Sequence, residues 1–245
     1  GLALPLHSLP FTEICSLGQD ITEAIGAKKW DPPVPPQLAG QVKGMFPSFM
    51  PKSDQERAQN LVDEIFVDMD REYEVTQKYD GSSMTVYHWN DEAGVCSRNL
   101  DLKINEANKD NTFVKIYNEI FMPKIDEFEG FAIQGEAMGP GIQNNELKLN
   151  RHTFFVYNVF DIRNGRWLTP IERMEFVQKL KIQHVPVLHV RASLRSLGIT
   201  NLEQLLKFAD GENKAGQPRE GVVFKSLDGQ FSFKAISNEW LLKNE

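Results

Sequence analysis

The sequence has few cysteines, no long apolar run and no excess of positive charge. Its 245 residues include only two cysteines, Cys15 and Cys96. Two are too few for a disulfide framework, so we expect a reducing intracellular compartment, cytoplasm or nucleus, and leave a single bridge open. No apolar run approaches the roughly 20 residues of a membrane-spanning helix, so no membrane role is expected. Lys and Arg number 27 against 34 Asp and Glu, a net charge of -7, so a nucleic-acid role would need a local basic site.

The composition that is present is that of an ordinary globular protein. Hydrophobic residues make up 41% and charged residues 25% of the chain, which excludes disorder, collagen and coiled coil. A chain of this length forms one large domain or two small ones. It begins at Gly1 without the basic-then-apolar pattern of a signal peptide. We therefore expect a fragment of a longer protein.

Proline and glycine punctuate the first fifty residues. We predict that residues 1–52 form an irregular segment packed on a domain spanning 53–245. Ser53 followed by Glu56 has the spacing of a capping box and predicts a helix to about residue 70. Three further helices are predicted: one from Thr169 with Glu172, one from Thr200 with Glu203, and a short one over 238–245.

From residue 72 onward the dominant period is two, which predicts β-strands. The predicted strands are 75–79, 83–89, 131–137, 154–162, 185–190, 221–225 and 230–235. The first two flank Asp80-Gly81, a dipeptide typical of hairpin turns. Because strands dominate and helices interrupt them irregularly, we predict an α+β fold of mostly antiparallel sheets with flanking helices.

The densest cluster of unusual residues is the pentapeptide 78–82, where Lys78 ends a predicted strand just before a tight turn. One interpretation is a solvated lysine beside a hairpin. The other is a lysine nucleophile, which must lose its proton and therefore needs burial or neighbouring cations to lower its pKa. The pentapeptide alone leaves both interpretations open.

Two strands near the C-terminus supply such cations. In residues 231–234, alternation puts both phenylalanines on one face and Lys234 on the other, toward a site or toward solvent. Glu220 and Lys225 fall on opposite faces of their strand, so they reach a common site only across a strand end or a bulge. A hairpin with solvated charges is the alternative.

Six short motifs follow one another along the chain: Lys78-Tyr79-Asp80-Gly81, Ser97-Arg98-Asn99, Gly135-Glu136, Phe160-Asp161, Glu220-Gly221-Val222-Val223-Phe224-Lys225 and Ser232-Phe233-Lys234. In this order they resemble the motifs of covalent polynucleotide ligases and capping enzymes, the nucleotidyltransferase superfamily. Segment 135–143 resembles ATP-dependent RNA ligases of the nick-sealing and RNA-editing type. Stretches 30–33 and 46–49, with Arg57, resemble the subgroup that carries an OB module ahead of its catalytic domain.

The resemblance implies a nucleotidyltransferase domain at 53–245, with the OB module absent from this chain. It also implies three chemical steps. Lys78 attacks the α-phosphorus of ATP and expels pyrophosphate, AMP passes to an RNA 5′-phosphate, and a 3′-OH displaces AMP to seal the strand. The expected partner is RNA with 5′-phosphate and 3′-OH ends, as a nicked duplex, and the expected form is a monomer.

Seven residues are implied to bind ATP or AMP: Gln77, at the base edge; Phe160, stacked on adenine; Glu136, at the ribose hydroxyls or a metal-bound water; Lys225 and Lys234, at the α-phosphate; Arg57 and Arg98, at the triphosphate or an RNA phosphate. Lys234 is also implied to help keep Lys78 unprotonated. The two arginines suit this role because guanidinium matches phosphate oxygens in bidentate fashion.

Three carboxylates, Asp80, Glu136 and Glu220, form the predicted metal site. Oxygen ligands suit Mg²⁺ or Mn²⁺, held largely through water, and the resemblance implies two ions during lysine adenylation. Structural salt bridges are the alternative. His184 and His189 face opposite sides of a predicted strand and are a poor metal pair.

Other functions stay open beside the ligase. Ser232 stands where some relatives carry a second lysine. This leaves open which side chains, besides Lys234, neutralise the charge of the phosphate. DNA ligases and capping enzymes are runners-up, because nothing after Lys234 is long enough for their C-terminal OB domain. A module that binds ATP and RNA without catalysis is the alternative from another class.

Overall fold

The computed structural model describes residues 5, 21, 24–26 and 33–244. The chain divides into two compact units, Gly1–Pro33 and Val34–Glu245. Within the few described residues of the first unit, Ile25 N donates a hydrogen bond to Ile21 O at 3.0 Å. Cys15 and most of the stretch 30–33 lie outside the described residues, so the expectations placed on them stay predictions.

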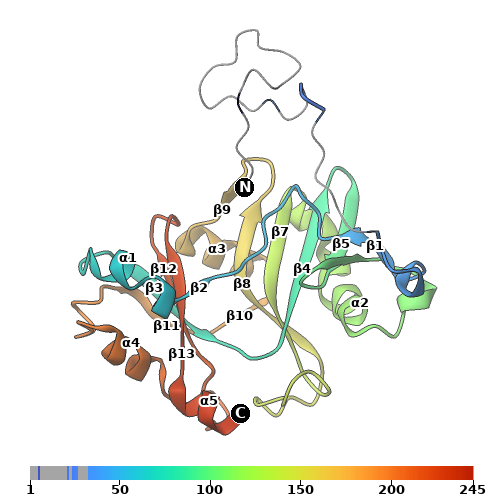
Figure 1. Cartoon of the computed structure of the whole chain (residues 1–245). Coiled ribbons are helices and arrows are strands. Elements are labelled where there is room, and N and C mark those ends of the chain that lie inside the picture. Colours follow the sequence, from blue (N-terminus) through green and yellow to red (C-terminus); the bar gives the residue numbers. More distant parts are fainter. Residues whose placement is uncertain (1–4, 6–20, 22–23, 27–32, 245) are drawn as a thin grey trace. The chain divides into compact units, whose positions relative to one another are not determined.

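The second unit contains two β-sheets (Figure 1). The larger has the strand order β1-β6-β5-β4-β7-β8-β10, with β9 paired to β8. Its strands are β1 (Val42–Met45), β4 (Ser82–Trp89), β5 (Glu92–Cys96), β6 (Leu100–Leu102), β7 (Phe131–Met138), β8 (Thr153–Asp161), β9 (Arg166–Trp167) and β10 (Gln183–His184). All pairs are antiparallel except β10 with β8. Because β1 belongs to this sheet, the unit begins at Val34, earlier than the predicted boundary at 53.

The smaller sheet has the strand order β11-β3-β12-β13-β2. Its strands are β2 (Glu56–Arg57), β3 (Tyr73–Lys78), β11 (Val187–Ala192), β12 (Gly221–Ser226) and β13 (Ser232–Ile236). Only β13 and β2 pair in parallel. The α+β class with mostly antiparallel sheets is therefore confirmed. Of the strand predicted at 185–190, residues 187–190 belong to β11 of the smaller sheet, and residues 185–186 lie between β10 and β11.

Helices flank the two sheets and are short. They are α1 (Val62–Phe66), α2 (Thr112–Ile116), α3 (Pro170–Leu180), α4 (Leu202–Ala209) and α5 (Asn238–Asn244), with the 3-10 turns η2 (Pro36–Leu38), η3 (Ala58–Asn60), η4 (Glu106–Asn108) and η6 (Met122–Phe128) and the π-helical turn η5 (Tyr117–Phe121). No helix among the described residues is long and apolar enough to cross a membrane.

Of the predicted helix starts, the one at Thr169 is confirmed. The Thr169 hydroxyl accepts from Glu172 N, and the Glu172 carboxylate accepts from Thr169 N. The start at Thr200 is one residue early, because Asn201 caps α4 by accepting from Gln204 N.

The helix predicted from Ser53 to about residue 70 is wrong. Ser53 does not cap a helix; its hydroxyl accepts a hydrogen bond from Asn158 Nδ2 at 2.6 Å. Glu56 and Arg57 form β2, and only Val62–Phe66 is α-helical. Pairing with β13 and the contact to β8 therefore override a local helix signal.

Each sheet has its own hydrophobic core. The core of the larger sheet includes Met84, Val86, Ile133, Phe154 and Leu180. The core of the smaller sheet includes Tyr73, Val75, Val222, Phe224 and Phe233. Phe233 is fully buried in this core, as the alternation in β13 predicts, and the neighbouring Lys234 side chain consequently projects from the opposite face.

The link between β3 and β4 joins the two sheets. The hairpin predicted around Asp80-Gly81 is wrong: β3 pairs with β12 and β11, whereas β4 pairs with β5 and β7. A Cβ atom on Gly81 would lie 2.6 Å from Ala137 O and 2.8 Å from Glu136 Cγ. Only glycine fits where the chain crosses β7, and this crossing places the end of β3 at the boundary between the sheets.

Candidate active site

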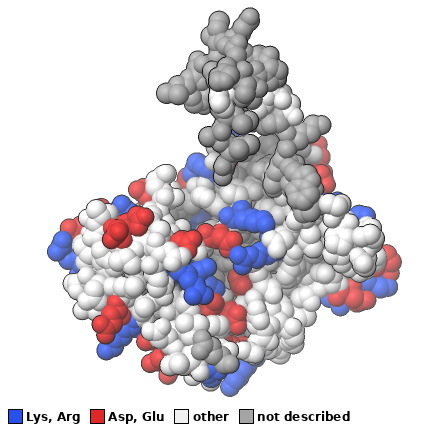
Figure 2. Space-filling model, in the orientation of Figure 1, with Lys and Arg blue, Asp and Glu red and all other residues white. Residues whose placement is uncertain are grey.

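A cavity of about 550 Å³ lies between the two sheets and receives side chains from both. On the face shown in Figure 2, basic and acidic side chains gather around a hollow. The charged side chains lining the cavity are Lys52, Asp54, Lys78, Asp80, Arg98, Glu136, Lys225 and Lys234. Seven of the predicted site residues therefore meet there through the fold: Gln77, Lys78, Asp80, Arg98, Glu136, Lys225 and Lys234.

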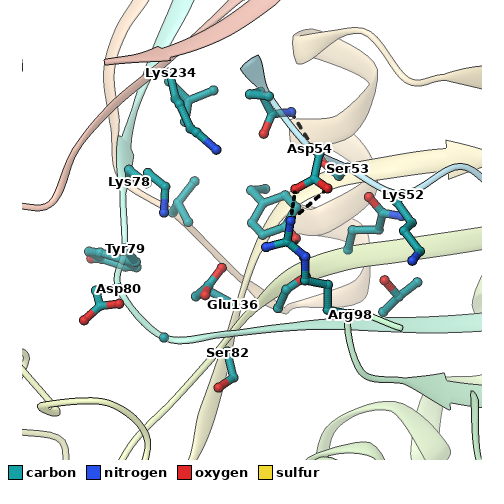
Figure 3. A pocket seen from close by; sticks show the side chains of 18 of the residues that line it. Lys52, Ser53, Asp54, Lys78, Tyr79, Asp80, Ser82, Arg98, Glu136 and Lys234 are labelled. Carbon is teal, nitrogen blue, oxygen red and sulfur yellow. Dashed lines mark hydrogen bonds and ion pairs between the residues drawn. The ribbon is translucent and has the colours of Figure 1, made fainter. Parts of the chain in front are cut away.

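Lys78 ends β3 and points into the cavity (Figure 3). Its Nζ lies 2.7 Å from the carboxylate of Glu220, which immediately precedes β12. The two strands are neighbours, with Gly221 opposite Lys78. The interpretation of Lys78 as a solvated hairpin lysine is excluded, because its side chain is only 25% exposed and lies between two sheets.

Two cations, Lys234 and Arg57, come from adjacent strands, with Lys234 opposite Arg57 in the β13–β2 pair. Lys234 points into the cavity on the same side as Lys78 (Figure 3). Burial lowers the pKa of Lys234, and the positive charges of Lys78, Arg57 and Arg98 lower it further. Arg57 itself is exposed and does not line the cavity. The basic group expected from the sequence is thus assembled, with Arg57 at its edge.

The three predicted metal ligands are arranged unequally. Asp80 and Glu136 line the cavity, whereas Glu220 does not line it and pairs with Lys78. Burial raises the pKa of Glu136 to about 7, helped by the negative charges of Glu220 and Asp80 and opposed by Lys78. Burial also raises the pKa of Asp80 and of Glu220.

No group of three His, Cys, Asp or Glu side chains within 33–244 is close enough to hold a metal ion alone. Crowded, buried carboxylates nevertheless fit a divalent cation chemically, because its charge relieves their repulsion. Water and phosphate oxygens would have to complete the coordination. His184 is not available for this, since Arg173 Nε donates to its Nε2 and its Nδ1 lies 2.6 Å from Val185 O.

Lys225 is buried rather than solvated, contrary to the hairpin alternative. Its Nζ donates to Asn158 Oδ1 at 2.6 Å and to the carbonyl oxygen of Tyr157. Burial lowers the pKa of Lys225 well below its usual value, and the charge of Arg173 adds to this effect. Two of its protons are therefore engaged by β8 at the floor of the cavity.

Gln77 and Tyr157 line the inner part of the cavity. Gln77 is 4% exposed, and its side-chain Nε2 has no partner within the described residues. The Tyr157 hydroxyl lies 3.1 Å from Ser83 Oγ, which fixes the ring. A polar donor and an aromatic ring thus occur together next to Lys78.

Phe160, predicted to stack on adenine, lies elsewhere. It is buried in a separate cluster, with its ring centroid 5.1 Å from that of Trp167, and it does not line the cavity. Phe160 lies opposite Ala132, which belongs to the same cluster and does not line the cavity either. A register shift between β7 and β8 acts on Tyr157 instead: Gly135 pairs with Val156 and Gln134 with Asn158, which leaves Tyr157 as the extra residue. A bulge of this kind changes which side chains face the cavity.

Comparisons with known proteins identify the family to which this geometry belongs. The family model of RNA ligases matches residues 71–236. The chain belongs to the RNA ligase family. No curated protein sequence matches it.

This RNA ligase family member is similar to solved structures of Naegleria gruberi RNA ligase. The one with PPi has a TM-score of 0.75 and 40% identity, covering 99% of this chain and 72% of that chain. Two lysine variants, one with ATP and Mn and one with AMP and Mn, have TM-scores of 0.76 at the same identity and coverage.

In this RNA ligase family member, residues 51–55, called the strap below, form a wall of the cavity that no sequence motif indicated. Four contacts hold the strap: Gln134 Nε2 to Pro51 O (2.8 Å), Lys52 Nζ to Asn99 Oδ1 (2.8 Å), Asn158 Nδ2 to Ser53 Oγ (2.6 Å) and Arg98 Nη2 to Asp54 (3.0 Å). All four partners are distant in sequence. The polar composition of the strap was the available signal, and it was interpreted as a helix start.

Proposed function

We propose that this protein is an ATP-dependent RNA ligase and that Lys78 is its nucleophile. The observation that carries the proposal is the position of the Lys78 amine, at the junction of two sheets, between the Glu220 carboxylate and a cavity that Lys234 also lines. A lysine poised beside a second cation in a cleft is the arrangement that covalent catalysis by an amine requires. The ATP and AMP complexes of the Naegleria enzyme support the choice of ATP as the nucleotide.

In the first step the lone pair of Lys78 Nζ forms a bond to the α-phosphorus of ATP. The bond from that phosphorus to the bridging oxygen breaks, pyrophosphate leaves with the electron pair, and the displaced amine proton passes to solvent. Lys234 neutralises charge on the α-phosphate, and its positive charge opposes protonation of Lys78. Positioning and charge neutralisation supply most of the catalysis in phosphoryl transfer.

The base of the nucleotide occupies the inner part of the cavity. We assign the stacking surface to Tyr157 in place of Phe160, because Tyr157 lines the cavity and its ring is held by Ser83. The unpartnered Nε2 of Gln77 is the candidate donor to the base edge. Lys225 supports this floor through the carbonyl oxygen of Tyr157.

The ribose and the metal belong beside the carboxylates. Glu136 lies between the lysines and Arg98 in Figure 3, where it is placed to accept from ribose hydroxyls or from a metal-bound water. Asp80, whose negative charge also acts on Glu220, would complete a water-mediated site for Mg²⁺ or Mn²⁺. A bound ion supplies positive charge to the phosphate oxygens. The manganese complexes of the Naegleria enzyme support this choice.

In the later steps AMP passes from Lys78 to an RNA 5′-phosphate, and a 3′-OH then displaces it. Arg98 at the cavity and Arg57 at its edge are the candidate phosphate contacts. We propose a nicked duplex as the substrate and a monomer as the working form. We further propose that an OB module lies outside this chain and that the nucleotidyltransferase domain includes residues 53–245.

Labelling with [α-³²P]ATP and Mn²⁺ tests the nucleophile. Wild type should acquire acid-labile label that survives denaturing electrophoresis, and Lys78→Met should acquire none. Lys43→Met is the matched control, because Lys43 pairs with Glu92 at 2.9 Å away from the cavity. Unlabelled wild type would favour the non-catalytic ATP- and RNA-binding module, whereas labelled Lys78→Met would place the nucleophile elsewhere.

A second experiment tests the polynucleotide. Sealing of nicked duplexes with RNA on the 3′-OH side should be faster than sealing of the matched all-DNA nick. Equal rates would count against RNA preference and return DNA ligase as the alternative. Labelling of the enzyme with [α-³²P]GTP, followed by transfer of the labelled GMP to a 5′-diphosphate RNA end with release of the lysine, would instead indicate a capping enzyme.

A further inference from the structure

Asp54 and Arg98 form an ion pair at the wall of the cavity. Arg98 Nη2 donates to both carboxylate oxygens of Asp54, each at 3.0 Å. Both residues line the cavity, and Figure 3 shows the pair facing Lys78 and Lys234 across it. Asp54 is the one acidic residue of the strap.

Stability does not account for this ion pair. The side chains of Arg98 and Asp54 are 67% and 56% exposed. Exposed ion pairs contribute little to stability, because solvent screens them and because two side chains lose conformational freedom. What such a pair does is select one orientation of a long, flexible arginine.

That orientation leaves most of the guanidinium available. The carboxylate engages a single nitrogen, Nη2, and within 33–244 neither Nε nor Nη1 of Arg98 has a protein partner. In Figure 3 the free part of the Arg98 guanidinium points toward the space between Lys78, Lys234 and Glu136. A planar fork held in this way fits two oxygens of a phosphate.

Asp54 is itself held firmly. Its neighbours Pro51, Lys52 and Ser53 are each hydrogen-bonded to the larger sheet or its loops. The anchor of Arg98 is therefore fixed before a ligand arrives. Orientation of this kind lowers the entropy lost on binding.

We propose that Asp54 is a positioning residue: it holds Arg98 by one nitrogen so that the rest of the guanidinium binds a phosphate in the cavity. The phosphate is that of ATP or the 5′-phosphate of RNA, so the inference rests on the proposed function. Asp54 does not touch the phosphate, which its own charge would repel.

Two assays distinguish the two phosphates. The first measures lysine adenylation against ATP concentration. The second measures transfer of AMP from preformed enzyme-AMP to 5′-phosphorylated RNA against RNA concentration. The variants are Asp54→Ala, Asp54→Asn, Arg98→Ala and the double alanine variant. Asp70→Ala is the matched control, because Asp70 pairs with Arg195 at 2.7 Å with exposures of 69% and 68%.

Asp54→Ala should raise the half-saturating concentration about five- to tenfold in at least one assay, with the maximal rate changed less than twofold. Arg98→Ala should act in the same assay at least as strongly, and the double variant should match Arg98→Ala, since Asp54 acts only through Arg98. Asp54→Asn retains an acceptor oxygen and should be intermediate. Asp70→Ala should match wild type.

Three results would overturn the inference. These are an Asp54→Ala variant within twofold of wild type in both assays, effects of Asp54→Ala and Arg98→Ala that add, and tighter phosphate binding by Asp54→Ala. The last would make Asp54 a competitor of the phosphate. In each case wild type still forms the adenylate; failure of wild type itself would instead refute the proposed function.

Discussion

The Lys78 amine and the Glu220 carboxylate lie 2.7 Å apart, with only 25% and 11% of their side chains exposed. The pair links the end of β3 to the residue before β12. Lys225, by contrast, lies near the far end of β12, opposite Glu74 of β3. The proposed nucleophile is therefore held by the folded chain alone.

The first prediction concerns the coupling of this pair. Removing one partner leaves the other charge poorly solvated, so Lys78→Met or Glu220→Gln should each lower the free energy of unfolding by about 1–3 kcal/mol. The double variant should lose less than the sum. Urea denaturation at pH 7.5 in EDTA measures all four proteins.

The more exposed pair of Lys43 and Glu92, 2.9 Å apart with exposures of 30% and 65%, is the control for this cycle. Its coupling should stay below about 1 kcal/mol. Additive losses for Lys78 and Glu220 would show that the two charges do not stabilise each other.

A second prediction separates Tyr157 from Phe160. Stacking of a base on an aromatic ring contributes about 1–3 kcal/mol, so Tyr157→Leu should weaken ATP binding by about tenfold or more. Tyr157→Phe keeps the ring and should bind within about threefold of wild type. Phe160→Leu, in a separate core, should leave ATP affinity within twofold and instead lower the melting temperature. The reverse pattern would return the stacking role to Phe160.

The sequence was sufficient where local pattern decides the structure. The alternation in β13 correctly separated Phe233, in the core, from Lys234, in the cavity. The capping box at Thr169 correctly started α3. The order of the motifs correctly predicted that Lys78 and Glu136 share one cavity. The first two features depend on residues that are close in sequence. The third depends on the resemblance of the six motifs to those of a known superfamily.

Prediction failed where distant contacts decide the structure. Ser53 accepts a hydrogen bond from Asn158, 105 residues away, and so forms part of the strap instead of a helix cap. Phe160 was assigned by its place before Asp161, but it packs opposite Ala132 in a separate cluster, and the bulge in β8 leaves Tyr157 as the extra residue at the cavity. The alternation of side chains within one strand does not reveal a register shift against the neighbouring strand.

A third prediction concerns the metal. Asp80 and Glu136 line the cavity, and no third carboxylate completes a protein-only site within 33–244. Asp80→Asn should therefore raise the Mn²⁺ concentration needed for half-maximal lysine adenylation, by about tenfold, while saturating Mn²⁺ restores part of the rate. Asp126→Asn, an exposed control on η6, should leave the Mn²⁺ dependence unchanged. An unaltered Mn²⁺ requirement in Asp80→Asn would exclude Asp80 from the metal site.

The last prediction concerns acid sensitivity, and it centres on His184. Burial and the charge of Arg173 lower the pKa of His184 to about 3. Arg173 Nε donates to its Nε2, so the ring must stay neutral, with its proton on Nδ1 toward Val185 O. As the pH falls below about 6.5, the unfolded chain binds a proton that the folded protein does not, so stability falls with pH.

Wild type should lose about 1–2 kcal/mol between pH 6.5 and pH 5 through this one group. His184→Gln offers Arg173 a neutral acceptor and should remove most of that loss, whereas His152→Gln, at a more exposed histidine, should behave like wild type. Urea denaturation at the two pH values measures the difference. If His184→Gln and wild type lose stability equally, the acid sensitivity has another source and the ring tolerates its second proton.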